Sequence, residues 1–145
     1  MNEVIYPDKF FRGISNCYLE NGYLLPEAFR LDKEREDGYC EISITWCDDS
    51  NAFDVIASQC KEDGSLQFPA GISEVIRKEL DERMKPQFIQ KNLLYERRPT
   101  PNNKYHGNLL VLGSLNKTIK NMIKSQLALL GQSTIHKNPY HSTNT

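Results

Sequence analysis

One stretch constrains the fold of this chain more than any other: residues 39–46, with the sequence YCEISITW. Apolar side chains at Cys40, Ile42, Ile44 and Trp46 alternate with the polar side chains between them. A period of two is what a strand with one buried face requires. The segment therefore predicts a β-strand in a sheet that is packed on one side, with its polar face (residues 41, 43 and 45) turned to water or lining a cleft.

Three other segments show the spacing of a helix. Apolar side chains recur at intervals of three and four residues over residues 50–62, 72–84 and about 115–130. Glycine or proline lies near the expected end of each segment, at Gly64, Pro86 and Gly131. We therefore expect a helix over each of the three segments.

The remaining chain supplies short strands and turns. Residues 88–96 and 108–113 are apolar enough for strands, and residues 9–15 form a short apolar segment that ends at Gly13. The dipeptide Asn21-Gly22 predicts a hairpin or turn, and residues 31–38 predict an exposed loop. A chain of 145 residues fits one domain. The sequence thus predicts a single α+β domain over residues 1–145, with about three helices and a small mixed or antiparallel sheet of four or five strands.

Charge is distributed unevenly along the chain. Residues 1–72 hold 6 Lys/Arg and 14 Asp/Glu, whereas residues 73–145 hold 12 and 5, although the whole chain has a formal net charge of −1. This asymmetry indicates either an anionic partner for the basic half or packing of the two halves against each other so that their fields cancel.

The basic half contains the candidate ligand-binding residues. Lys117, Lys120 and Lys124 form a stripe along the third expected helix, and Arg97 and Arg98 precede it in the chain. Such a pattern is typical of a surface that contacts phosphate groups of RNA or a nucleotide, although a charged helix face can also simply be solvated.

The candidate catalytic residues are His136, His141 and Arg12. The three histidines of the chain all lie in its last 40 residues, and imidazole can act as a general acid or base near neutral pH. In the segment FFRGIS, Arg12 is next to Gly13, an arrangement that suits a clamp for phosphate or carboxylate. The alternatives are an ion pair for Arg12 and a local role for the histidines in docking the proline-containing tail.

No motif indicates a metal, a cofactor or a membrane. The four cysteines form no CxxC pair, so we predict reduced thiols, no disulfide framework and no metal site. No signal peptide and no run of about 18 apolar residues occurs, so we expect a cytoplasmic protein without a membrane partner.

Several segments carry a resemblance. The order FRGIS, NGYLLPEAFRL, EISITW and IHKNPYH resembles small uncharacterised bacterial proteins that begin with an aromatic-Arg-Gly segment and end on a proline-containing segment with histidine. FRGIS also resembles the arginine-bearing first strand of mono-ADP-ribosyltransferases, which present Arg, Ser and Glu around NAD. That resemblance implies roles for Arg12 and Ser43, whereas no Glu-x-Glu motif follows them in this chain.

Three functions are consistent with these patterns. The first is a small bacterial or phage protein that engages a phosphate-rich ligand, RNA or a nucleotide, with His-dependent cleavage or transfer at phosphorus. The second is a non-catalytic interaction module, such as an immunity, antitoxin or regulatory protein, that covers a protein partner of opposite charge. The third is an NAD-directed transferase.

Overall fold

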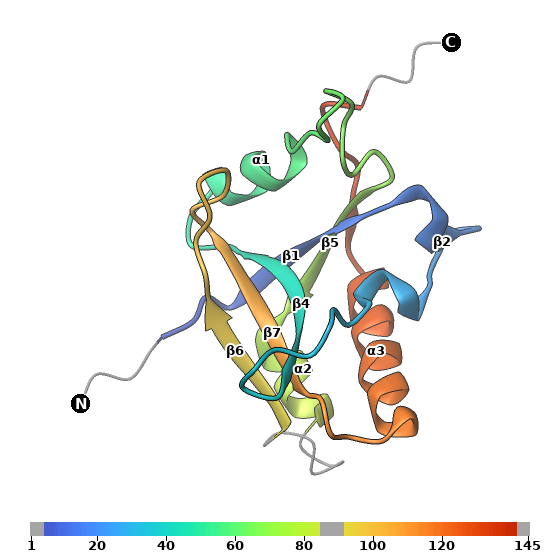
Figure 1. The fold of residues 1–145 in the computed structure, drawn as a ribbon. Helices are drawn as coiled ribbons and strands as arrows, with labels where there is room; N and C mark the ends of the chain where they lie inside the picture. Colours follow the sequence, from blue (N-terminus) through green and yellow to red (C-terminus); the bar gives the residue numbers. More distant parts are fainter. Residues whose placement is uncertain (1–4, 85–91, 142–145) are drawn as a thin grey trace.

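The computed structural model describes residues 5–84 and 92–141. A six-stranded antiparallel sheet forms the centre of the molecule, in the strand order β6-β7-β4-β1-β5-β8 (Figure 1). The strands are β1 (Lys9–Ile14), β4 (Tyr39–Trp46), β5 (Gly71–Ile76), β6 (Leu93–Arg97), β7 (His106–Leu112) and β8 (Ile135–His136). The predicted α+β class is confirmed, and the sheet has more strands than expected.

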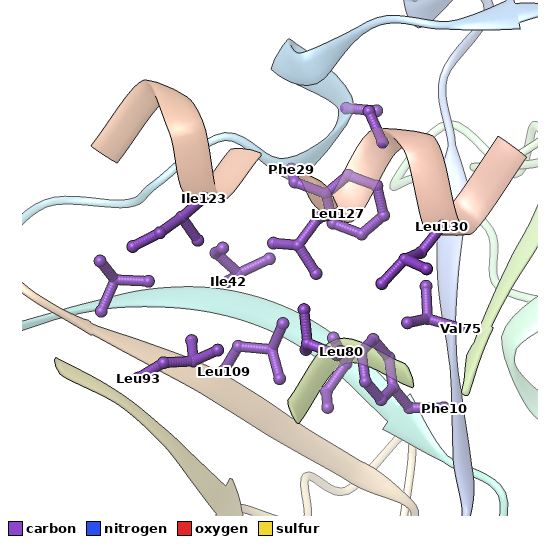
Figure 2. Packing of buried hydrophobic residues seen from close by; sticks show 14 of the residues in the cluster. Phe10, Phe29, Ile42, Val75, Leu80, Leu93, Leu109, Ile123, Leu127 and Leu130 are labelled. Atoms are coloured by element: carbon purple, nitrogen blue, oxygen red, sulfur yellow. The ribbon is translucent and has the colours of Figure 1, made fainter. Parts of the chain in front are cut away.

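The strand predicted over residues 39–46 is β4 itself. Ile42, Ile44 and Trp46 are buried on one face of the sheet, as the alternation predicts. They belong to the larger of two cores, which is closed by the long helix α3 (Lys117–Gln132), whose Ile123, Leu127 and Leu130 point toward the sheet (Figure 2).

A smaller core lies on the opposite face of the sheet. There α1 (Asn51–Ala57) packs on β1, β4 and β5, and Ala52, Ile56 and Ala57 of the helix meet Phe11 and Ile72 of the sheet. Because successive strand residues point to opposite faces, Phe10 contributes to the larger core and Phe11 to the smaller one. The sheet is therefore covered on both faces near β1.

The helix predicted over residues 72–84 is wrong in its first half. Residues 71–76 form the strand β5, and only Arg77–Met84 is helical, as α2. The three-residue spacing of Ile72 and Val75 fits one helical face, whereas in the strand these two side chains enter opposite cores. β-Branched residues fit a strand well, and pairing with both β1 and β8 decides the outcome.

The other predicted boundaries shift by smaller amounts. The first helix ends at Ala57 rather than near residue 62, and the third runs through Gly131 to Gln132. Gly131 is buried where α3 crosses β5, and a Cβ there would lie 2.4 Å from Ser73 Oγ. The predicted strand 88–96 corresponds to β6 from Leu93 onward, and its residues 88–91 lie outside the described ranges.

The turn dipeptide forms the predicted hairpin. Asn21 and Gly22 both have positive φ, 52° and 82°, and connect β2 (Leu19–Glu20) to β3 (Tyr23–Leu24). Positive φ at both central residues is the geometry that Asn-Gly favours in a tight hairpin. Two short 3₁₀ helices flank this hairpin, η1 (Asn16–Tyr18) and η2 (Pro26–Phe29), and residues 31–38 form the expected loop.

Gly107 shows how one large side chain fixes the neighbouring strands. The indole of Trp46 crosses β7 at this residue and donates a hydrogen bond of 3.1 Å to the carbonyl of Glu96 on β6. A Cβ at residue 107 would lie 2.3 Å from both Trp46 Nε1 and the Glu96 oxygen. Only glycine fits at this crossing.

All four cysteines are free thiols, in agreement with the prediction. Among the helices of the two described ranges, none combines the length and the apolar character needed to cross a membrane.

The centre of the sheet contains an opening. β1 pairs with β5 over six residues and β4 pairs with β7 over seven, whereas β1 and β4 pair only at Phe10 with Trp46 and at Phe11 with Thr45. Beyond Phe11 the two strands separate. A cleft lies at this separation.

Candidate functional site

A cleft of about 210 Å³ lies at the opening between β1 and β4, on the face of the sheet that carries α1. Its walls include Arg12, Gly13, Ser43, Gln59, Phe68 and His106. Gly13 is required here because the ring of Phe68 packs directly on it, and a Cβ at residue 13 would lie 2.3 Å from that ring. The absence of a side chain at residue 13 therefore allows the Phe68 ring to form one wall of the cleft.

Arg12 bridges the separated strands. Its Nε donates to the carbonyl of Ala28 at 2.9 Å, and its Nη1 donates to the carbonyl of Ser43 at 2.7 Å. No carboxylate of the described chain lies within ion-pair distance of this guanidinium, so the alternative of an ion pair for Arg12 is not seen. Burial lowers the pKa of Arg12, and three of its five N–H groups are left for other acceptors.

His106 and Ser43 share the face of the sheet that lines the cleft. His106 is opposite Thr45, and Ser43 is the next residue along β4 on that face. His106 Nδ1 lies 2.9 Å from the carbonyl oxygen of Arg98. A carbonyl can only accept, so Nδ1 carries the proton, and Nε2 of the neutral ring keeps a lone pair.

Two amide side chains that line the cleft, Asn103 and Gln59, are held in place by hydrogen bonds. Asn103 Nδ2 donates to Thr45 Oγ1 at 2.9 Å, and Asn103 Oδ1 accepts from the backbone N–H of Tyr105 at 2.9 Å. Gln59 donates through Nε2 to the carbonyls of Val55 and Asn102, both at 3.1 Å. The cleft is thus built on side chains that already have fixed positions.

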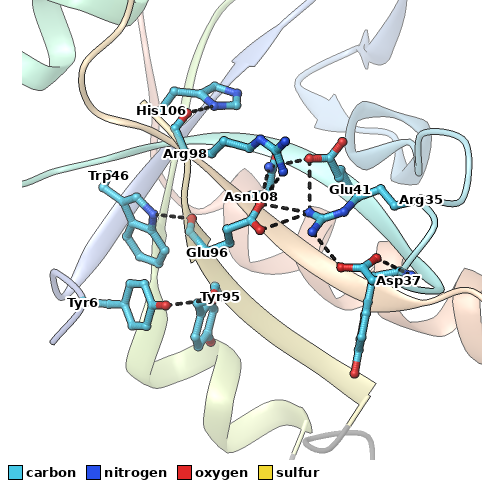
Figure 3. Close-up of polar contacts among 11 residues, drawn as sticks. Tyr6, Arg35, Asp37, Glu41, Trp46, Tyr95, Glu96, Arg98, His106 and Asn108 are labelled. Atoms are coloured by element: carbon cyan, nitrogen blue, oxygen red, sulfur yellow. Dashed lines mark hydrogen bonds and ion pairs between the residues drawn. The ribbon is translucent and has the colours of Figure 1, made fainter. Parts of the chain in front are cut away.

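A polar cluster continues from the cleft along the same face of β4, β7 and β6. Asn108 Nδ2 donates to Glu41 at 2.6 Å and to Glu96 at 2.8 Å, and Arg35 Nη1 lies 3.0 Å from Glu96 (Figure 3). Burial raises the pKa of Glu96, but the hydrogen bonds from Asn108 and Arg35 outweigh burial and lower it overall. Glu96 is therefore held as a carboxylate.

The three predicted catalytic residues do not converge. On β1, Arg12 points to the face opposite Phe11, whereas the ring of His136 packs against Phe11 with its centroid 6.3 Å away. His136 Nε2 instead lies 3.1 Å from Glu74 Oε1. His141 is exposed in the tail, where its N–H donates to the carbonyl of Asn138 at 3.1 Å.

The tail around these histidines is anchored by its other residues. Asn138 is buried and donates through Nδ2 to the carbonyls of Ala57 at 2.8 Å and Phe68 at 3.0 Å. The Tyr140 hydroxyl donates to Asp54 of α1. The docking of the tail therefore depends on Asn138 and Tyr140.

The predicted ligand-binding cations are also dispersed. Arg97 makes two hydrogen bonds to Asp48, at 2.7 and 2.9 Å, which raise its pKa, and Lys120 Nζ donates to the carbonyl of Gly113 at 2.6 Å. The stripe of Lys117, Lys120 and Lys124 lies on α3, on the other side of the sheet from the cleft. Arg98, with a side chain 59% exposed, is the predicted ligand-binding residue that lies beside His106.

The sequence reasoning missed the roles of Asn108, Glu96 and Arg35. Asn108 begins the apolar segment NLLVLG, and a polar residue at the start of a buried strand was the available signal. Glu96 and Arg35 come from segments 61 residues apart, so their contact follows from the sheet order.

Comparison with protein-family models, curated proteins and solved structures finds no match to this chain. Across residues 5–84 and 92–141, no three or more histidine, cysteine, aspartate or glutamate side chains are grouped so as to hold a metal ion.

Proposed function

We propose that this protein binds a nucleotide at the cleft between β1 and β4, with NAD-type dinucleotides as the first class to test. One observation supports the proposal above all: where β1 and β4 separate, Arg12 Nη1 donates to the backbone carbonyl of Ser43 at 2.7 Å, so the two residues lie side by side at the cleft. These are the two residues that the resemblance to mono-ADP-ribosyltransferases implies for an NAD site.

The chemistry of the cleft suits a phosphate-bearing or amide-bearing group. Arg12 borders the cleft at the gap between the strands, although its side chain leaves β1 on the face opposite Phe11 and is anchored to the carbonyls of Ala28 and Ser43. No carboxylate of the described chain neutralises its charge at contact distance, and His106 adds the lone pair of Nε2. Guanidinium groups in partly buried sites bind phosphate and carboxylate oxygens strongly.

The size of the cleft limits what it encloses. Pockets that surround a drug-sized ligand usually have about 300–1,000 Å³. A cleft of about 210 Å³ is smaller and encloses one end of a dinucleotide, while the rest lies outside. The proposal assigns no chemistry to His136 or His141, because they lie apart from Arg12.

Isothermal titration with NAD, ADP-ribose, AMP and inorganic phosphate tests the proposal. We expect His106→Ala to weaken binding about five-fold, the loss of about one hydrogen bond. His141→Ala is the matched control, because it removes an exposed imidazole in the tail and leaves the cleft intact. Arg12→Lys keeps the charge but loses the planar fork and is expected to weaken binding more.

Two results would contradict the proposal. One is the absence of binding to all four ligands at dissociation constants below about 1 mM, equivalent to about −4 kcal/mol. The other is equal weakening by His106→Ala and His141→Ala. Because Arg12 also supports the fold, the histidine pair keeps the test valid if Arg12→Lys fails to fold.

A further inference from the structure

A groove of about 990 Å³ lies between α2 and α3, the two helices that pack on the larger core (Figure 1). We call it the α2–α3 groove. Its walls include Ile76, Lys78, Glu79, Glu82, Arg83 and Leu129. It shares no lining residue with the cleft between β1 and β4, so the inference below does not depend on the nucleotide proposal.

Two apolar side chains of the groove are exposed to solvent. Ile76 is 40% exposed and Leu129 is 55% exposed. β8 pairs with β5 at Ile72 and Ser73, so Ile76, at the far end of β5, lies beyond the part of the sheet that β8 covers. Exposed apolar side chains that share one hollow and are surrounded by polar residues are typical of an interaction surface.

The charged side chains of the groove are balanced in number. Lys78 and Arg83 are basic and Glu79 and Glu82 are acidic, so together these four have a net charge of zero. All four are exposed, and within residues 5–84 and 92–141 none of them makes an ion pair. A surface without net charge attracts neither RNA nor a strongly basic segment, and it suits a partner that presents both signs.

The order of these charges along α2 makes the surface complementary to itself. Residues four apart are neighbours on a helix, so Glu79 and Arg83 form one row and Lys78 and Glu82 form a second. The acid comes first in one row and the base comes first in the other. When two antiparallel copies of α2 meet around a two-fold axis, each row faces the same row reversed, so Glu79 faces Arg83 of the second copy and Lys78 faces its Glu82.

We infer that the α2–α3 groove is the contact surface of a homodimer, in which two copies of this chain pack around a two-fold axis with their α2 helices antiparallel. Each ion pair then forms twice, and Ile76 and Leu129 of each copy are covered by the other copy. Because each copy contributes only a few apolar side chains, the dimer is weak and reversible.

Sedimentation equilibrium of the full chain tests the inference. We expect a reversible dimer with a dissociation constant of about 10–100 µM, as suits a small interface. The protein is then mostly dimeric at about 1 mM and monomeric at about 1 µM, where chemical denaturation measures the single chain.

Two matched leucine substitutions distinguish the groove from non-specific association. Leu129→Arg places a charge in the groove, and Leu94→Arg makes the same change at a leucine of β6 that is 41% exposed and lies outside the groove. We expect Leu129→Arg to raise the dissociation constant about ten-fold or more, because the guanidinium would have to be buried against apolar side chains. Leu94→Arg is expected to change it less than about two-fold.

A charge swap tests the antiparallel arrangement. Lys78→Glu leaves two acids in one row, so the row repels its copy, and we expect the dissociation constant to rise about five-fold or more. The double variant Lys78→Glu with Glu82→Lys restores one base and one acid to the row. We expect it to dimerise within about two-fold of the wild type.

Three results would overturn the inference. They are a wild-type chain that stays monomeric at about 1 mM, equal effects of Leu129→Arg and Leu94→Arg, or a double variant that dimerises no better than Lys78→Glu. All the substituted side chains are exposed, so each variant is expected to keep the urea midpoint of the wild type at about 1 µM. If Leu129→Arg does not fold, the charge swap still decides the question.

Discussion

Replacement of Asn138 by alanine is expected to destabilise the whole domain, although the residue lies only seven positions from the end of the chain. Its side chain is 5% exposed and makes three hydrogen bonds, to the carbonyls of Ala57 and Phe68 and from the N–H of Tyr140. At about 1 kcal/mol for each bond, Asn138→Ala costs about 3 kcal/mol. For a domain of this size, that loss lowers Tm by roughly 6–12 °C.

Urea unfolding followed by far-UV circular dichroism measures this cost. His141→Ala is the matched control, because it alters an exposed side chain of the same tail and is expected to change stability by less than about 0.5 kcal/mol. If Asn138→Ala costs less than about 1 kcal/mol, or no more than the control, then the tail does not stabilise α1 and the argument from these hydrogen bonds is refuted.

Three further predictions concern the sheet and its main core. Gly107→Ala places a Cβ against Trp46 and the Glu96 carbonyl, so we expect a cost of about 1–3 kcal/mol, measured as a lower urea midpoint. The near-UV spectrum of the single tryptophan is expected to change as well, and an unchanged spectrum would contradict this. Because the fold lowers the pKa of Glu96, its ionised form contributes stability above the ordinary pKa of about 4.3, and this stability is lost as pH falls through the folded value. The difference in stability between wild type and Glu96→Gln is therefore expected to be largest near pH 7 and to shrink below about pH 4. A difference that does not change with pH would disprove this prediction. Leu127→Ala empties a fully buried position of α3 and is expected to cost about 2–5 kcal/mol of stability. The control is Leu129→Ala on the same helix, which is expected to cost less than about 1 kcal/mol because Leu129 is 55% exposed. Equal costs in chemical denaturation would argue against the packing described for α3.

Local patterns predicted those elements whose conformation depends on their own side chains. The strand of residues 39–46, the Asn-Gly hairpin and the third helix all follow from alternation, turn geometry or helical spacing. β5 did not follow from local pattern, because Ile72, Val75 and Ile76 satisfy a helical spacing as well as a strand. Its pairing with β1 and β8, which local sequence does not encode, decided between the two.

The candidate sites were predictable only in part, for a similar reason. Arg12 was identified from its apolar neighbours and Gly13, and it does line a cleft. Its expected partners His136 and His141 are elsewhere, because the tail is bound to α1 by Asn138 and its position depends on that contact. The ion pairs of Arg35 join the loop of residues 31–38 to Glu41 on β4 and Glu96 on β6, so only the strand order brings these charges together.

The position of β1 has a consequence for how the chain folds. Although β1 is the first strand of the sequence, it lies inside the sheet, and its pairs are distant: Phe11 meets Thr45, 34 residues later, and Arg12 meets Ser73, 61 residues later. Contacts of such separation require large loops to close before they stabilise anything, which slows folding. During synthesis, β1 therefore lacks β5, its partner over six residues, until about half of the 145 residues have been made.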